Sequence, residues 1–170
     1  AEKIWNDAGL AGFKVIGLNP GGVSVPEKLW TPQGFAELAD LLQNRGFIAA
    51  FFGGTYEIGT VNKIRSLMKT EQIRFTGRLN LLQLAALIKK CVCFVSAETG
   101  PMHLAISQEV PVVLLHGPTS QHCTPYTDKK MIVRSGLPCL GCKTGHSVHT
   151  CMKTITAKAV YEAVKQFCGE

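Results

Sequence analysis

Long uninterrupted apolar runs are missing from this chain of 170 residues, although 46% of its residues are hydrophobic. A helix that crosses a membrane needs about 20 mainly apolar residues, and no segment has that character. The first residues, Ala1–Leu10, also lack the charged start and apolar centre of a secretion signal. We therefore expect a soluble protein, and its 18% of charged residues suits one globular α/β domain.

Clusters of like charge are missing as well. The 18 Lys and Arg residues outnumber the 12 Asp and Glu residues, and the net charge of +6 favours anionic ligands such as diphosphates, nucleic acids or acidic membranes. However, no run of five basic residues occurs, and aromatic residues are not interleaved with Lys and Arg. We therefore expect no nucleic-acid partner.

Two widespread nucleotide-binding motifs are also absent. No Gly-x-Gly-x-x-Gly follows a predicted strand, and no Gly-Lys-Ser or Gly-Lys-Thr closes a P-loop. These absences argue against a nicotinamide-dependent dehydrogenase and against a P-loop NTPase. A phosphate site in this chain would need other loops.

The sequence does contain a regular alternation of short apolar segments and helical patterns. We expect strands buried on both faces at Phe13–Leu18, Phe47–Phe52, Ile73–Thr76, Val92–Ala97, Val112–His116 and Met131–Arg134. We expect helices at Pro32–Arg45, Ile58–Met68, Leu81–Lys90, Pro101–Gln108 and Ile155–Phe167. This order predicts a Rossmann-like three-layer α/β sandwich with a mainly parallel, doubly wound sheet of about six strands.

Boundary residues support two of these helices. Thr31 is the expected N-cap of the first helix, with Pro32 at its first position and Gly46 just beyond its end. Thr154 is the expected N-cap of the last helix. In an open parallel sheet, ligands bind beyond the carboxyl ends of the strands, so the residues that follow each strand carry the functional information.

The loop after the first strand has the composition of a phosphate-binding turn. Gly21 and Gly22 let backbone amides approach a phosphate, Ser24 adds a hydroxyl donor, and Lys28 adds a mobile positive charge. Pro-Gly-Gly is also a common tight turn, so the pattern alone leaves a purely structural role open.

The segment after the fourth strand crosses a glycine turn into a helix that opens with Pro101. The free amides of that helix start favour an anion, and Thr99 and His103 can donate further hydrogen bonds to a diphosphate. Glu98 suits sugar hydroxyls instead, because a carboxylate repels phosphate. A histidine at this place can equally be a capping or packed residue.

The cysteines divide into two groups. The total of seven is odd, and Cys91 and Cys93 lie in an apolar segment, which indicates reduced thiols in a cytosolic protein. The long loop Leu137–Thr154 carries a set of soft ligands that could bind a structural zinc ion, namely Cys139, Cys142, His146 and Cys151. Their spacing is loose, so reduced loop thiols and a disulfide stay open as alternatives.

One combination of motifs resembles the signature of the ADP-heptose lipopolysaccharide heptosyltransferase family. It consists of Thr-Gly-Pro-Met-His-Leu-Ala at 99–105, Val-Pro-Val-Val at 110–113 and Gly-Pro-Thr at 117–119. The resemblance extends to Pro-Gly-Gly at 20–22 with Lys28 and Trp30, to Gly77 and Leu79, and to Cys-Met at 151–152. It covers almost the whole chain, from about Val15 to Val164.

This resemblance implies a two-lobed GT-B-type enzyme in which each lobe is Rossmann-like. In the family, the C-terminal lobe holds the nucleotide-diphosphate sugar and the N-terminal lobe holds the acceptor, and this chain matches the C-terminal lobe. Residues 13–170 would be the nucleotide-sugar-binding domain, and residues 1–12 a linker from an N-terminal lobe that the chain lacks. The family also implies a cytoplasmic location, peripheral at the inner membrane face.

The resemblance assigns roles by position. Glu98 stands where the family usually has Asp and would contact a sugar hydroxyl. The other implied donor-binding residues are Gly21, Gly22, Ser24 and Lys28 at the diphosphate, Thr99, Gly100 and His103 on its other side, Glu57 at the ribose and Leu79 beside the adenine.

The family reaction is an inverting transfer, in which an acceptor hydroxyl attacks the anomeric carbon of an ADP-sugar as the nucleoside diphosphate leaves. An Asp in the N-terminal lobe removes the hydroxyl proton, so this half would hold no catalytic base and require no cofactor. The implied acceptor is lipopolysaccharide or a related surface glycan. A stand-alone nucleotide-sugar-binding module is the main alternative, and a two-lobed epimerase, with Glu98 as its only candidate acid, is the third.

Overall fold

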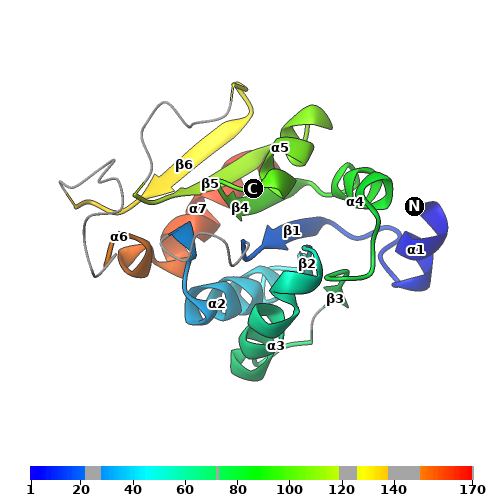
Figure 1. Ribbon diagram of the computed structural model, residues 1–170, viewed down its shortest axis with the longest axis horizontal. Helices are drawn as coiled ribbons and strands as arrows, with labels where there is room; N and C mark the ends of the chain where they lie inside the picture. Colours follow the sequence, from blue (N-terminus) through cyan, green and yellow to red (C-terminus); the bar gives the residue numbers. More distant parts are fainter. Residues whose placement is uncertain (22–27, 72, 119–125, 138–149, 170) are drawn as a thin grey trace.

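The protein is a three-layer α/β sandwich (Figure 1). The computed structural model describes residues 1–21, 28–71, 73–118, 126–137 and 150–169. Its six strands form one sheet in the order β3-β2-β1-β4-β5-β6, and every described pairing is parallel. The predicted Rossmann-like fold with a six-stranded doubly wound sheet is therefore confirmed.

The strands lie close to their predicted positions. Their bounds are β1 Val15–Asn19, β2 Ile48–Phe51, β3 Ile73–Arg74, β4 Cys93–Ala97, β5 Val112–His116 and β6 Lys130–Arg134. The four central strands are buried almost throughout, as expected for a parallel sheet covered on both faces. The prediction of complete burial is wrong for β6, where Met131, Ile132 and Arg134 are exposed because this strand forms one edge of the sheet.

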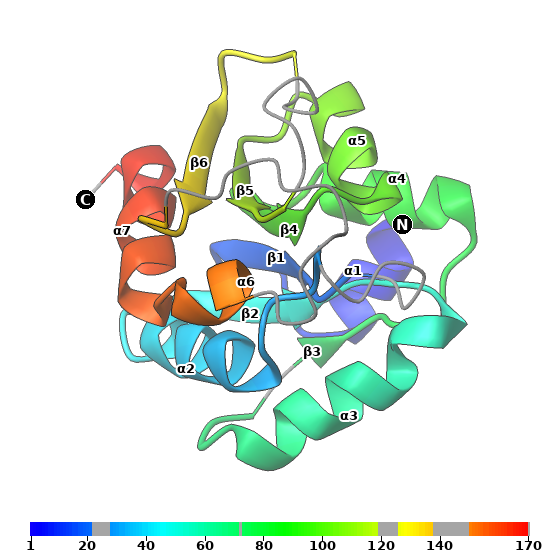
Figure 2. The ribbon, with the colours of Figure 1, turned by 60° about the vertical axis from the view of Figure 1, so that its left-hand side comes forward.

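Two hydrophobic layers sandwich the sheet. Alternate side chains of each strand point to opposite faces, so Val113 and Leu115 of β5 join one layer while Val112 and Leu114 join the other. The first layer is covered by α2 Pro32–Gln43, α3 Ile58–Leu67, α6 Thr150–Thr154 and α7 Ala157–Cys168, and the second by α1 Glu2–Asp7, α4 Leu81–Ile88 and α5 Gly100–Ser107. Figure 2 shows α7 beside α2 on one side of the sheet and α5 beside α4 on the other.

The capping prediction succeeds for one helix and fails for another. Thr31 caps α2, since its hydroxyl accepts a hydrogen bond from the amide of Gly34 at 3.0 Å. The last helix begins later than predicted, because Thr156 is its N-cap and Thr154 ends the separate helix α6. The hydroxyl of Thr154 donates to the carbonyl of Cys151 at 3.0 Å instead.

The first residues are more ordered than a bare linker. Helix α1 lies within the segment 1–12, and Trp5 and Leu10 are buried in the second hydrophobic layer. The indole nitrogen of Trp5 donates to the carbonyl of Leu10 at 3.1 Å. This segment therefore packs onto the domain, whereas its connection to a further lobe stays a prediction. No helix among the described residues has the length and apolar character needed to cross a bilayer.

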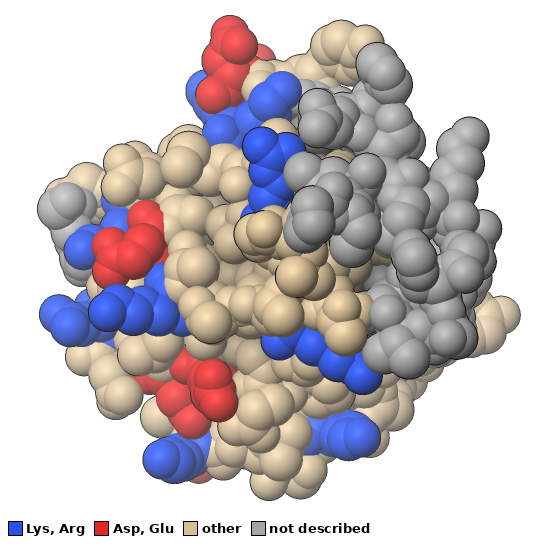
Figure 3. Space-filling model, turned by 90° about the vertical axis from the view of Figure 1, so that its left-hand side faces the viewer, with Lys and Arg blue, Asp and Glu red and all other residues tan. Residues whose placement is uncertain are grey.

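The strand order fixes where the site lies. The chain leaves β1 toward one side of the sheet and leaves β4 toward the other, although β1 and β4 are direct neighbours. In a doubly wound sheet, ligands bind in the crevice beyond the carboxyl ends of such a strand pair. In Figure 1, the arrowheads of β1, β5 and β6 point to the left edge of the molecule, and Figure 3 views that edge directly.

Candidate functional site

A buried hydrogen-bond network joins the carboxyl ends of β1 and β4. The side-chain amide of Asn19, which is 1% exposed, donates to the carbonyl of Phe52 at 3.0 Å. Its oxygen Oδ1 accepts a hydrogen bond from Thr99 Oγ1 at 2.9 Å and lies 3.2 Å from Ser96 Oγ. These contacts fix the loop after β2, the end of β1 and the start of α5 relative to one another.

The predicted glycine turn begins where the structure needs a glycine. Gly21 has a φ of 88°, and a Cβ atom there would lie 2.9 Å from Leu29 Cδ2 and 3.7 Å from Thr99 Cγ2. Gly21 therefore lies beside Thr99, the residue that precedes α5, and its positive φ favours glycine. Gly22 and Ser24 lie outside the described residues.

The N-terminus of α5 opens onto this crevice. Thr99 precedes the helix, yet its side chain does not cap it, because the hydroxyl donates to Asn19 instead. A Cβ atom on Gly100 would meet nothing within 4 Å, so there is open space beside the first helical residue. The backbone amide of Gly100 can therefore face an anionic ligand, whereas Pro101 has no amide hydrogen and the amide of Met102 donates to the carbonyl of Thr99 at 3.1 Å.

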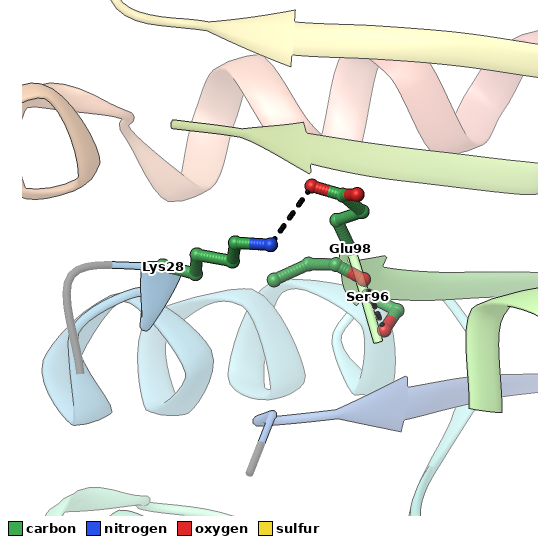
Figure 4. Close-up of polar contacts among 4 residues, drawn as sticks. Lys28, Ser96 and Glu98 are labelled. Carbon is green, nitrogen blue, oxygen red and sulfur yellow. Dashed lines mark hydrogen bonds and ion pairs between the residues drawn. The ribbon is translucent and has the colours of Figure 1, made fainter. Parts of the chain in front are cut away.

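Lys28 and Glu98 form an ion pair across the crevice. Lys28 Nζ lies 3.1 Å from Glu98 Oε2, and the two side chains are 25% and 18% exposed. Figure 4 shows Lys28 reaching from the segment before α2 toward Glu98, just beyond the end of β4 near Ser96. The predictions gave these two residues separate ligands, a diphosphate and a sugar, whereas the structure brings them into direct contact.

Glu57 and Leu79 lie around the ends of the two strands β2 and β3. Glu57 is 9% exposed, and its carboxylate accepts a hydrogen bond from the amide of Gly54 at 2.6 Å. The following residue, Ile58, lines a pocket of about 260 Å³ together with Thr76 and Gly77. Leu79 packs against the second hydrophobic layer and lines a neighbouring pocket of about 460 Å³. Within the described part of the chain, neither side chain forms a hydrogen bond or an ion pair with Lys28 or Glu98.

His103 is exposed on the first turns of α5, which leaves its ring accessible to a ligand.

A second histidine, at the end of β5, is buried without a hydrogen-bond partner among the described residues. His116, the last residue of β5, is only 2% exposed, and neither ring nitrogen has a hydrogen-bond partner within the described part of the chain. The sequence analysis missed Asn19 and Ser96 as site residues. A usable signal existed, since each is a polar residue at or near the end of an otherwise apolar strand.

The structure describes four of the cysteines, and all four are buried, namely Cys91, Cys93, Cys151 and Cys168. Burial raises the pKa of both Cys91 and Cys93 far above the ordinary range of a thiol, which keeps them protonated and unreactive. Cys151 packs into the first hydrophobic layer from helix α6. The other candidate zinc ligands, Cys139, Cys142 and His146, lie outside the described residues. Among those described, no cluster of three metal-ligating side chains occurs.

The face that contains the carboxyl ends of the strands is not a continuous basic patch. In Figure 3, its described part is mainly uncharged, and Lys and Arg side chains lie in several separate places. This distribution suits a small anionic ligand held by a few groups better than an extended polyanion.

Comparison with known proteins gives the family. The sequence pattern of glycosyltransferase family 9 (heptosyltransferase) matches residues 3–153. Lipooligosaccharide heptosyltransferase 2 of Haemophilus influenzae is 34% identical over 139 residues, which cover 78% of this chain and 40% of that protein.

Two solved structures share the fold over nearly the whole chain. A family 9 glycosyl transferase from Veillonella parvula has a TM-score of 0.87 at 29% identity, over 98% of this chain and 49% of that one. The ADP-heptose lipopolysaccharide heptosyltransferase II of Escherichia coli has a TM-score of 0.84 at 28% identity, over 98% of this chain and 50% of that one. The chain thus spans about half the length of these relatives. It belongs to glycosyltransferase family 9, the heptosyltransferase family.

Proposed function

We propose that this chain is the donor-binding half of an inverting glycosyltransferase that transfers a heptose or a related sugar from an ADP-sugar. The acceptor is lipopolysaccharide or another surface glycan, and the reaction takes place on the cytoplasmic side of the inner membrane. Membership of the family and the names of the relatives support this reaction type.

The proposal rests on one observation, that three anion-binding features lie close together at the carboxyl edge of the sheet. The turn at Gly21, the ammonium group of Lys28 and the uncapped start of α5 converge beyond the neighbouring ends of β1 and β4. A diphosphate in this crevice would receive backbone amides from one side and a positive charge from the other. Gly22, Ser24 and His103 would add contacts, while Glu57 would hold the ribose and Leu79 would flank the adenine.

The chemistry of this half is stabilisation of the leaving group. As the bond between the anomeric carbon and the diphosphate breaks, negative charge grows on the diphosphate, and Lys28 together with the amide of Gly100 at the start of α5 stabilises it. These groups act without a cofactor or a catalytic metal, because they already offset the charge. The base that removes the acceptor proton belongs to an N-terminal lobe that also binds the acceptor.

A stand-alone nucleotide-sugar-binding module is the alternative. The two proposals differ in whether the full reading frame encodes a second Rossmann-like lobe upstream of this domain. The relatives' greater length favours the two-lobed enzyme, since the chain covers 40% to 50% of each of those compared above.

Calorimetric titration of the 170-residue chain with ADP, UDP and GDP tests the proposal. We expect weak binding with a preference for ADP, and at least a tenfold loss of affinity in Lys28→Ala, about 1.4 kcal/mol. Lys89→Ala is the matched control, because Lys89 is an exposed lysine at the end of α4 that leads into the opposite, amino end of β4. Equal affinity for all three nucleotides would contradict the preference for ADP, and equal losses in the two variants would contradict the diphosphate assignment.

A further inference from the structure

We propose that Glu98 makes the diphosphate site selective for an esterified nucleoside diphosphate, such as a nucleotide sugar, over the free nucleoside diphosphate that the reaction releases. This inference rests on the proposed function, because it assumes that the diphosphate binds beside Lys28. It adds a role for Glu98 that differs from a hydrogen bond to a sugar hydroxyl.

The ion pair with Lys28 is the first step of the argument. A diphosphate that approaches Lys28 also approaches Glu98, because the two charged groups are 3.1 Å apart. Both side chains are more than 70% buried, so little water is in contact with them and their charges are only weakly screened. The ligand therefore meets one positive and one negative group together, rather than a free lysine.

The position of Glu98 decides which end of the ligand it faces. Glu98 directly follows β4 and directly precedes Thr99, which stands before the first amides of α5. In the proposed function the ribose and the adenine lie at Glu57 and Leu79, beyond the ends of β2 and β3. The terminal phosphate of a diphosphate at Lys28 then points toward the end of β4, where Glu98 lies, with the substituent of that phosphate beyond it. In a nucleotide sugar this substituent is an uncharged sugar, whereas in free ADP it is an ionised oxygen.

The two ligands consequently differ in charge at the place where Glu98 lies. The terminal phosphate of ADP carries close to two negative charges near neutral pH, and the esterified phosphate of ADP-glucose carries one. The carboxylate therefore opposes ADP more strongly than it opposes a nucleotide sugar. Weaker binding of the released nucleotide would speed its exchange for a new donor.

Affinity measurements on Glu98→Gln test this inference, with ADP, ADP-glucose and AMP as the probes. Glutamine keeps the shape and the hydrogen-bonding capacity of the side chain and removes its charge. We expect ADP to bind about fivefold more tightly, which corresponds to about 1 kcal/mol for a like-charge contact at a partly exposed site. ADP-glucose should tighten less than ADP, and AMP should change by less than about twofold because it lacks the terminal phosphate.

Two further variants serve as controls. Glu98→Asp keeps the charge and should keep the wild-type preference between ADP and ADP-glucose. Glu162→Gln removes the acid of another Lys–Glu pair, with Lys165 on α7 at 3.4 Å, and should leave all affinities unchanged.

The outcomes separate this inference from the proposed function. If Glu98→Gln leaves ADP affinity unchanged or weakens it, the selectivity role is wrong, even where ADP-glucose binds less well through a lost sugar contact. If the wild-type chain binds neither ADP nor ADP-glucose, or if Lys28→Gln weakens neither, the proposed function itself fails.

Discussion

Thr99 donates a hydrogen bond from its hydroxyl to the side-chain oxygen of Asn19 at 2.9 Å, and this contact ties the start of α5 to the end of β1. Because the hydroxyl is directed toward Asn19, it does not cap α5, and the backbone amide of Gly100 stays available. One partly buried contact therefore both holds the start of α5 against the end of β1 and leaves the anion site open.

Removal of the Asn19 amide should destabilise the fold. Asn19→Ala leaves the carbonyl of Phe52 without its side-chain donor and removes the acceptor used by Thr99, all in a region closed to water. We expect the free energy of unfolding to fall by about 2 to 3 kcal/mol, measured by urea denaturation. Ser107→Ala removes an exposed hydroxyl that donates to the carbonyl of Leu104 at 2.8 Å and should change stability by less than about 0.5 kcal/mol. Equal effects of the two variants would contradict the role of Asn19.

The two tryptophans provide a matched pair for separating stability from ligand binding. The indole of Trp30 donates to the carbonyl of Ile155 at 3.0 Å, and that of Trp5 donates to Leu10 at 3.1 Å, both from buried positions. Trp30→Phe and Trp5→Phe should each lower the free energy of unfolding by about 1 to 3 kcal/mol. Only Trp30→Phe should also weaken ADP binding, because Trp30 anchors the segment that carries Lys28.

Denaturation curves and ADP titrations of the two tryptophan variants check this difference. Trp5 is the internal control, since it lies on helix α1 in the other hydrophobic layer. Loss of ADP affinity in Trp5→Phe comparable to that in Trp30→Phe would mean that the titration reports general destabilisation.

The fold was largely predictable because its signals are local. The alternation of apolar segments and helices gave every strand in the sheet, and Thr31 and Pro32 marked the start of α2 correctly. The start of α7 was misplaced because Thr154 and Thr156 both suit an N-cap, and only the packing of α6 decides between them. Burial of β6 was overestimated because the sequence does not reveal which strand lies at an edge.

The sequence indicated several residues of the candidate site but not the contacts between them. Glycine and charge patterns pointed to Gly21, Lys28, Glu98 and Thr99, and the structure places all four around the ends of β1 and β4. The ion pair between Lys28 and Glu98 joins residues 70 positions apart, so it depends on strand order rather than on spacing. The importance of Asn19 was missed for the same reason, since its partners come from the loop after β2 and from β4.

The side chain of Phe94 on β4 occupies the space beside Gly17 of β1. A Cβ atom there would lie 2.4 Å from Phe94 Cδ2, and Phe94 is fully buried on the neighbouring strand. Gly17→Ala should therefore lower the free energy of unfolding by about 1 to 3 kcal/mol through overpacking. Gly59→Ala is the opposite case, because a Cβ atom on this residue of α3 meets nothing within 4 Å. Gly59→Ala should stabilise the protein by about 0.4 to 1 kcal/mol, because alanine lowers the entropy of the unfolded chain. Thermal denaturation of both variants checks that one lowers the free energy of unfolding and that the other raises it.

The buried thiols should make stability fall at alkaline pH. Burial raises the pKa of Cys91 and Cys93 in the folded protein, whereas an unfolded thiol ionises at a pKa of about 8.5. Below that pH both states hold their protons, so the thiols contribute no pH dependence. Above it, only the unfolded state releases protons, and each thiol lowers the free energy of unfolding by about 1.4 kcal/mol per pH unit.

Urea denaturation between pH 8 and pH 10 measures this effect, with the double variant Cys91→Ala and Cys93→Ala as the control. Lysines and tyrosines titrate in both proteins, so the difference between the two slopes isolates the two thiols. We expect the wild-type slope to be steeper by about 2 to 3 kcal/mol per pH unit at the alkaline end. Parallel slopes would mean that both thiols ionise in the folded state, which contradicts the burial of Cys91 and Cys93 in the two hydrophobic layers.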